Sequence, residues 1–258
     1  MVKIGFDMQL NKLEKYLDEY FAVYEFQADP SQNGLQVEAN SKVTKIATAV
    51  DACMDTFKKA KKYGADLLLV HHGIFWNRSL KVKGVHGRRI SFLIKNNISL
   101  YGMHLPLDVH KKTGNNAQLA KLLDLKVVSS FGNYKGFEIG LEVKTSKPVN
   151  LETMTKKITK LLGYKPTVLN FGNKKIHKIA IVTGGGSSEI SEVARKNIDL
   201  FITGEGGHSA YNQIKDYGLN VIYAGHYATE TVGIKALGEH LEQKFGLEHI
   251  FIDNPTGF

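Results

Sequence analysis

Two similar segments of this 258-residue chain each carry an imidazole followed by a carboxylate. The segment ISLYGMHLPLD contains His104 and Asp108, and the segment NVIYAGHYATE contains His226 and Glu230. At an offset of 122 residues the two histidines align, and so do the two acids. Each copy is an apolar, strand-like run that ends at the histidine, with the acid four residues later. Imidazole and carboxylate groups are ligands for divalent metal ions, so both segments predict metal-binding residues.

A second pair of segments repeats at an offset of 133 residues. KIATAV aligns with KIAIVT, and the run DLLL from Asp66 aligns with DLFI from Asp199. An internal repeat of this kind predicts two similar α/β halves. We expect the halves to face each other across a pseudo-twofold axis, with the metal site between them.

The segment LLLVHHGIFW places His71 and His72 at the end of an apolar strand. Open α/β sheets usually place their sites at the carboxyl ends of strands. Adjacent side chains of a strand point to opposite faces, so one ion can bind both histidines only if the backbone turns, for example at Gly73. Two metal ions would also satisfy both rings, and a structural histidine pair is the alternative.

The predicted ligands contain no thiolate, since a single cysteine, Cys53, excludes zinc–thiolate clusters and an internal disulfide. Imidazoles and carboxylates suit two divalent ions of Zn, Fe, Mn, Co or Ni, without choosing among these metals. Glu230 could bridge both ions at the start of a long helix, and ions about 3.5–4 Å apart can activate a shared water. Pro106 argues against a helical pairing of His104 with Asp108 and favours a turn. The full set of predicted metal ligands is His71, His72, His104, Asp108, His226 and Glu230.

Two further segments have weaker signals. Glu205 and His208 follow the strand that corresponds to the one ending in His71, so we interpret them as proton carriers for a metal-bound water. The alternative is a helix cap and a surface histidine. TGGGSS, from Thr183, joins a strand to a helix and is either a phosphate-binding loop or a tight structural turn.

Strand and helix signals alternate along the chain, which predicts an α/β fold with helices covering the sheets. We expect two halves, 1–130 and 131–258, forming one compact unit without an inserted domain, with the boundary inside 125–150. Helices are expected at 9–20, 54–63 (stopped by Gly64), 87–96, 115–123, 150–162, 188–197, 207–216 and 229–245. Strands are expected at 44–50, 66–70, 98–103, 136–145, 177–183, 199–203 and 219–224.

The formal net charge of +9 favours anionic partners such as nucleotides or nucleic acid. We find no concentrated run of like charge that would by itself predict a nucleic-acid surface. A loop and the start of the helix that follows it are basic. This segment either binds an anion or is ordinary solvated surface. It contains Lys81, Lys83, His86, Arg88 and Arg89. No apolar run approaches the ~18 residues of a membrane span, no signal peptide is recognisable, and a cytoplasmic protein is expected.

The motifs HHGIFW, MHLPLD and AGHYATETVGIKAL, with SQNGLQVEAN and TGEGGHSA, resemble the Nif-three-like dinuclear metal-centre family. Its bacterial members are often labelled GTP cyclohydrolase I type 2 homologues. The resemblance covers residue 9 to the C-terminus and implies homohexamers of two α/β halves around a central site. It implies metal ligands at His71, His72, Asp108, His226 and Glu230, with Glu230 touching both ions. His104 matches a family histidine that is either a ligand or a neighbour of the ligands.

These observations predict a metal-dependent hydrolase of a small, nucleotide-like or phosphate-bearing anion. The family label suggests opening of the GTP ring, although no residue identifies guanine. The alternatives are a metal-stabilised regulatory or nucleic-acid-binding protein without turnover, and a metal-storage protein.

Overall fold

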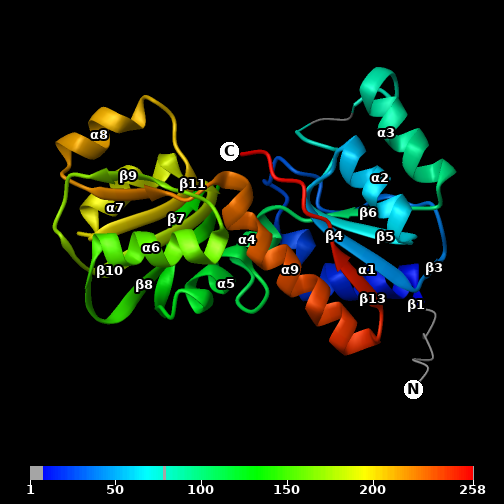
Figure 1. Ribbon diagram of the computed structural model, residues 1–258. Coiled ribbons are helices and arrows are strands. Elements are labelled where there is room, and N and C mark those ends of the chain that lie inside the picture. Colours follow the sequence, from blue (N-terminus) through cyan, green and yellow to red (C-terminus); the bar gives the residue numbers. More distant parts are fainter. Residues whose placement is uncertain (1–7, 78–79, 258) are drawn as a thin grey trace. The chain divides into compact units, whose positions relative to one another are not determined.

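The computed structural model describes residues 8–77 and 80–257, which form two compact α/β units (Figure 1). The first unit contains the described residues up to Thr113 together with Ile234–Asn254. The second unit contains Gly114–Gly233 and the last residues of the chain. This division differs from the predicted halves because the C-terminal segment returns to the first unit, where its strand pairs with Lys45–Asp51. Within the described residues, no helix has both the length and the apolar character needed to cross a bilayer.

The first unit contains a five-stranded sheet in which four neighbouring strands are parallel and one edge strand is antiparallel. A separate two-stranded ribbon is formed by β1 (Met8–Gln9) and β3 (Lys42–Val43). The order of the main sheet is β13 (Glu248–Phe251), β4 (Lys45–Asp51), β5 (Leu67–His72), β6 (Ser99–Gly102) and β2 (Gly34–Val37).

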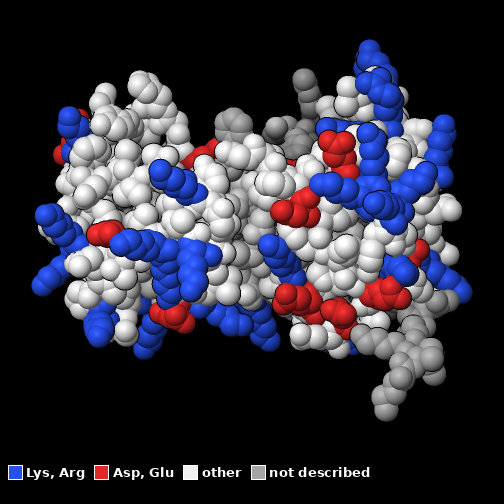
Figure 2. All heavy atoms as spheres, viewed as in Figure 1, with Lys and Arg blue, Asp and Glu red and all other residues white. Residues whose placement is uncertain are grey.

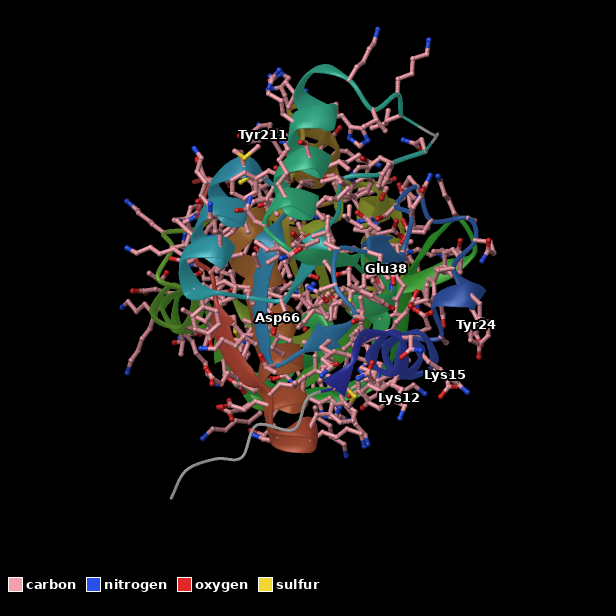
Figure 3. All side chains as sticks on the ribbon, turned by 90° about the vertical axis from the view of Figure 1, so that its right-hand side faces the viewer. Lys12, Lys15, Tyr24, Glu38, Asp66 and Tyr211 are labelled. Atoms are coloured by element: carbon pink, nitrogen blue, oxygen red, sulfur yellow. The ribbon has the colours of Figure 1, made fainter. Side chains whose placement is uncertain are left out.

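Helices of the first unit follow the apolar spacing of the sequence. In α1, Leu10, Leu13 and Leu17 are buried because they recur at helical spacing, whereas Lys12 and Lys15 project outward (Figure 3). The predicted stop of α2 is confirmed, since the helix ends at a glycine with a φ of 78°. The helices are α1 (Leu10–Tyr20), α2 (Met54–Tyr63), α3 (Gly84–Lys95) and α4 (Leu105–Val109), with a 3-10 turn at Val23–Glu25.

The core of the first unit lies where α2 and α3 cover one face of the sheet. Phe57 of α2 and Leu93 of α3 are fully buried against Leu68 and Leu100 of the neighbouring strands. Alternation along the strand sends Tyr101 to the other face, where its hydroxyl donates a hydrogen bond to Asp18 of α1 at 2.6 Å. Helices therefore cover the sheet as the sequence predicts.

The second unit contains a six-stranded mixed sheet. Its three central strands, β10, β11 and β12, are parallel. The predicted boundary region 125–150 is instead the hairpin β7–β8, which extends this sheet. The order is β7 (Lys126–Tyr134), β8 (Phe137–Asn150), β10 (Lys175–Gly185), β11 (Leu200–Glu205), β12 (Asn220–Tyr223) and β9 (Thr167–Asn170).

Helices cover both faces of the second sheet (Figure 1). Leu119 of α5 and Met154 of α6 pack with Ile179 and Ile202 in one buried cluster, while α7 and α8 lie on the opposite face. The helices are α5 (Asn115–Leu122), α6 (Leu151–Leu162), α7 (Ile190–Arg195), α8 (Ala210–Asp216) and α9 (His226–Phe245), with a 3-10 turn at Ser187–Glu189. Residues of α9 from Ile234 onward belong to the first unit.

The two sheets carry matching hydrogen bonds at the offset of 133 residues. Asp66 Oδ2 accepts the backbone N–H groups of Thr44 and Lys45 at 2.7 and 3.0 Å. Its counterpart Asp199 accepts the N–H groups at the two corresponding positions at 2.9 and 2.8 Å. Each aspartate therefore ties the start of one parallel strand to the start of the next.

The register of the third parallel strand differs from the sequence alignment. Met103 N–H donates to Val70 O at 2.9 Å, and Ala224 N–H donates to Thr203 O at 2.8 Å. The acceptors are 133 residues apart, whereas the donors are 121 residues apart. The strands β6 and β12 therefore correspond at an offset of 121, not 122.

This shift means that His104 corresponds in register to Gly225, and His226 lies one residue further along. The sequence alignment followed the shared tyrosines, but Tyr101 is fully buried and Tyr223 is partly exposed. One residue on a helix is a rotation of about 100°. The two imidazole–carboxylate pairs are therefore similar in composition and not equivalent in position.

Replacing Asp66 by Ala should lower the free energy of unfolding of the first unit by about 1–3 kcal/mol, because the N–H groups of Thr44 and Lys45 lose their acceptor. The only tryptophan, Trp76, lies in this unit, so denaturation followed by its fluorescence measures the change. The matched control is Asp55→Ala, which removes an exposed ion pair and should change stability by less than about 0.5 kcal/mol. Equal denaturation midpoints for Asp66→Ala and Asp55→Ala would contradict a stabilising role of the Asp66 hydrogen bonds.

Candidate metal centre

Three histidines of the first unit meet at the carboxyl end of its sheet. His71 and His72 end β5, and His104 directly precedes α4, just beyond the neighbouring parallel strand β6. One ring nitrogen of each lies within 4.8 Å of those of the other two. The ring centroids are 4.6 Å apart for His71 and His72, and 5.3 and 5.8 Å from these rings to His104. The spacing of these groups fits a shared metal ion.

The tautomers of the strand histidines are fixed by their partners. His71 Nδ1 is 3.0 Å from the carbonyl oxygen of Met103, and His72 Nδ1 is 2.8 Å from Asp51 Oδ1. A carbonyl and a carboxylate only accept, so Nδ1 of each ring carries the hydrogen. The neutral rings then have their lone pair on Nε2, which is the arrangement that metal-binding histidines use.

His104 is held in the same way by a buried carboxylate. Its Nδ1 lies 2.8 Å from Oδ1 of Asp29, whose side chain is fully buried. Asp29 also accepts the backbone N–H groups of Ser31 and Leu105 and the side-chain amide of Asn33. Burial raises the pKa of this carboxyl, but the hydrogen bonds and the charge of His104 outweigh it, so the pKa lies below its ordinary value. Asp29 therefore stays ionised and orients the ring.

The backbone that follows the two strand histidines is tightly held. The side chain of Gln36 fills the space beside Gly73, where a Cβ atom would lie 2.2 Å from Gln36 Nε2. Gln36 Oε1 accepts the N–H of Ile74 at 2.8 Å. The glycine that the sequence suggested as the turn is thus packed against an amide that fixes the loop.

Asp108 lies close to this cluster on a short helix. Its Oδ1 is 3.6 Å from His71 Nε2, and its side chain is 9% exposed. The prediction of a turn without a helix is wrong, since α4 begins at Leu105 with His104 as the residue that precedes it. Pro106 is accommodated because it occupies the first turn, where its missing N–H needs no partner.

The second unit carries an imidazole between two carboxylates. His226 is the first residue of α9, and its Nε2 lies 3.1 Å from Oε1 of the buried Glu230, one turn later. Its Nδ1 lies 3.0 Å from Oε1 of Glu205, at the end of β11. The helix begins three residues before the predicted start at 229, so this pair shares one helix face.

The two carboxylates control the charge of His226. Burial lowers the pKa of the ring, but hydrogen bonds and charge from Glu230 and Glu205 outweigh burial and raise the pKa to about 9. In the metal-free protein the ring is therefore an imidazolium at neutral pH. A metal ion that binds either ring nitrogen of this imidazolium must displace the proton on that nitrogen.

Gly184 leaves space for the carboxylate of Glu230. Its φ is +66°, and a Cβ atom there would lie 2.2 Å from Glu230 Oε1 and 3.2 Å from His226 Nε2. The N–H of Gly184 donates to Thr229 Oγ1 at 3.0 Å. Gly184 and Gly185 end β10, where the register with β11 shifts, and this irregular strand end brings backbone close to the imidazole–carboxylate pair.

The two predicted proton carriers differ in position. Glu205 contacts His226 and has a half-exposed side chain, so it connects the ring to solvent. His208 is exposed, and among the described residues its side chain has no hydrogen bond to His226 or Glu230. The geometry is compatible with a proton carrier at Glu205.

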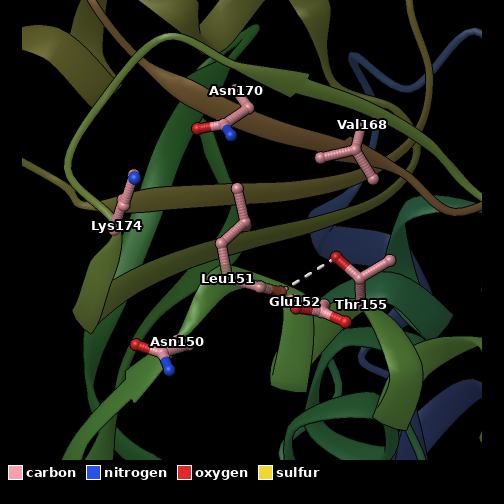
Figure 4. Close-up of a pocket in the computed structure, with 7 residues that line it drawn as sticks. All are labelled: Asn150, Leu151, Glu152, Thr155, Val168, Asn170 and Lys174. Atoms are coloured by element: carbon pink, nitrogen blue, oxygen red, sulfur yellow. Dashed lines mark hydrogen bonds between the residues drawn. The ribbon is translucent and has the colours of Figure 1, made fainter.

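A cavity elsewhere in the second unit has no metal-binding character. It has a volume of about 520 Å³, and the hydroxyl of Thr155 donates to Leu151 O at 2.9 Å at its edge (Figure 4). None of the predicted ligands lines it. Its lining residues are Asn150, Leu151, Glu152, Thr155, Val168, Asn170 and Lys174. Concave shape alone therefore does not identify the chemical site.

Sequence reasoning missed the residues that hold the rings. Asp51 ends the strand beside β5 and pairs in register with His72, so strand order could have revealed it. Asp29, Asn33 and Gln36 lie in or near SQNGLQVEAN, which was noted only as a family motif. Their contacts depend on a loop whose path no periodicity predicts.

Known proteins resemble this chain over nearly its whole length. The family model described as Duf34/NIF3 (NGG1p interacting factor 3) matches residues 8–257. A protein from Pyrococcus abyssi named GTP cyclohydrolase 1 type 2 homolog is 44% identical, with 97% of this chain and 100% of the relative covered. A protein of that name from Archaeoglobus fulgidus is 40% identical, with 96% and 99% covered. The resemblance inferred from the motifs is confirmed.

Solved structures show the same α/β fold. TTHA1606 from Thermus thermophilus superposes with a TM-score of 0.91 at 40% identity, covering 97% of this chain and 100% of that one. Reduced HcgD from Methanocaldococcus jannaschii superposes with a TM-score of 0.84 at 28% identity, covering 96% and 99%. The predicted fold class is therefore confirmed.

In the metal-free protein, the ring of His226 should titrate near pH 9, which NMR of the imidazole can measure. The unfolded ring titrates near pH 6.5, so its charge stabilises the fold fully below that pH, and this contribution is lost as the pH rises through about 9. His226→Gln should remove that part of the decline in unfolding free energy, whereas the exposed control His208→Gln should retain it. A ring that titrates near pH 6.5 in the native fold would contradict the arrangement.

Proposed function

Because the chain belongs to the Duf34/NIF3 family, we propose that it binds two divalent metal ions and hydrolyses a small nucleotide-like or phosphate-bearing anion. The observation that carries the proposal is the cluster of three imidazoles in the first unit, with ring nitrogens within 4.8 Å of one another. Bound divalent ions would supply a water of lowered pKa and would polarise the bond under attack.

The donor set fits such ions chemically. His71, His72 and His104 each have Nδ1 committed to an acceptor, which directs the Nε2 lone pair to a ligand. Three rings at this spacing would repel one another if all were protonated, so neutral rings beside the carboxylate of Asp108 favour a cation instead. Imidazole nitrogen and carboxylate oxygen suit Zn, Fe, Mn, Co or Ni.

The second unit supplies the remaining proposed ligands, His226 and Glu230. Glu230 has two carboxylate oxygens and can contact both ions, as the family resemblance implies. Its burial would leave a costly charge without a cation or a proton nearby, and His226 supplies that proton in the metal-free state. Glu205, half exposed beside His226 Nδ1, is placed to accept a proton at Oε1 and pass it to solvent.

The substrate class follows from charge and from the names of relatives. A net charge of +9 favours an anion, and relatives are named for GTP cyclohydrolase 1 type 2, which points to a purine nucleotide. We also propose self-association, with a homohexamer expected from the resemblance, which light scattering after size-exclusion chromatography would measure. A metal-stabilised regulatory or nucleic-acid-binding role without turnover is the alternative.

Metal analysis and a substrate screen test the proposal together. The native chain should contain two ions and should hydrolyse a nucleotide, phosphate ester or cyclic phosphodiester, whereas Asp108→Ala should lose metal and turnover while keeping its fold. Asp55→Ala, which removes an exposed carboxylate of α2, should keep both ions. Two ions in Asp108→Ala would refute the ligand assignment, and a fully loaded native chain without turnover on any substrate would favour the alternative.

Replacing Asp51 by Asn should lower metal affinity by about 10–100-fold, because the acceptor that orients His72 loses its charge. Competition with a chromophoric chelator measures the affinity. Asp55→Asn is the matched control, since that carboxylate is exposed and pairs with exposed Lys58. If both variants bind metal like the native chain, Asp51 does not support a metal ligand.

A further inference from the structure

Most of the net positive charge of the chain belongs to one stretch. Residues 54–98 contain ten Lys and Arg and only two Asp and Glu, a net charge of +8, whereas the whole chain has +9. The sequence shows no continuous basic run because the apolar strand β5 separates the cations. In the fold, α2 and α3 flank this strand and cover the same face of the sheet, so the basic side chains gather over these two helices (Figure 2).

A groove of about 640 Å³ lies along α3 beside the start of α2, and we call it the α2–α3 groove. Three cations and no carboxylate line it. The Lys61 ammonium adds a fourth positive charge, 5.9 Å from the ring of Phe92. The lining residues are Met54, Val82, Lys83, Gly84, Gly87, Arg88, Ser91, Phe92, Lys95 and Asn96.

The cations of this groove are not neutralised within the chain. Among residues 8–77 and 80–257, Lys61, Lys83, Arg88 and Lys95 form no ion pair with a carboxylate. By contrast, Lys58 pairs with Asp55 at 3.7 Å. Uncompensated cations around a concave surface concentrate field there and attract anions.

The residues that lie between the cations of the groove are small or apolar. Gly84, Gly87 and Ser91 recur along one side of α3, and a Cβ atom at Gly84 would meet nothing within 4 Å. Met54 and Val82 add apolar surface, and Val82 is 65% exposed. Apolar surface bordered by cations suits a ligand with charged groups on one edge and flat apolar faces on the other.

From this geometry we propose that the α2–α3 groove binds single-stranded nucleic acid, with phosphates on Lys61, Lys83, Arg88 and Lys95. The apolar residues then contact bases that a duplex would keep stacked inside. Lys62 and Lys81 of the same basic stretch are also exposed, which favours a long polyanion over a short acidic peptide. This inference is independent of the proposed hydrolase.

A matched pair of variants tests the groove in the metal-loaded full chain. Fluorescence anisotropy should show that Lys83→Gln/Arg88→Gln binds labelled oligouridylate or oligothymidylate on the order of tenfold more weakly than the native chain at about 50 mM salt. The slope of log affinity against log salt should fall in magnitude by about 1.4, because two phosphate contacts are lost. Lys12→Gln/Lys15→Gln removes the same charge from the outward face of α1 (Figure 3) and should bind like the native chain.

Each other outcome overturns the inference. Equal losses in the two double variants would show an unspecific charge effect, and unchanged binding would remove the groove from the interface. A duplex that binds as tightly as the single strands would exclude base contacts. An acidic peptide that displaces the oligonucleotide more effectively than unlabelled oligonucleotide would assign the groove to a protein partner.

Discussion

The hydrogen bond at Nδ1 of each clustered histidine is the constraint on which the site depends. Met103 O, Asp51 and Asp29 each accept from one ring, and each therefore fixes a tautomer and an orientation. These acceptors come from a strand end and two loops, so the fold has to bring several distant segments to one sheet edge. Without them the rings could rotate, and the lone pairs would no longer converge.

Much of the architecture could be predicted because it depends on local patterns. Leu13 and Leu17 at helical spacing, the apolar run before His71, and the stop at Gly64 all have direct counterparts in the structure. The return of the C-terminal strand to β4 could not be predicted, because its four residues carry no periodicity that specifies a partner. Strand pairing across two hundred residues is decided by tertiary packing.

The candidate site was predictable in its ligand types and less so in its geometry. Composition and spacing singled out His104 and His226, but the alignment placed them at equivalent positions, and the strand register separates them by one residue. Pro106 was taken to favour a turn over a helix, although the first helical turn accommodates it. Asp29 was missed because a lone acid in a loop has no pattern until the loop folds over His104.

The imidazolium of His226, held between Glu205 and Glu230, determines how the charge of this site is balanced before a metal ion binds. A proton on this ring compensates the charge of the buried Glu230 carboxylate, so the second unit needs no metal ion to neutralise that charge. Small zinc domains, in contrast, remain unfolded until their ion arrives. Under the proposed function, binding of a cation at His226 would then displace a proton within an already folded framework.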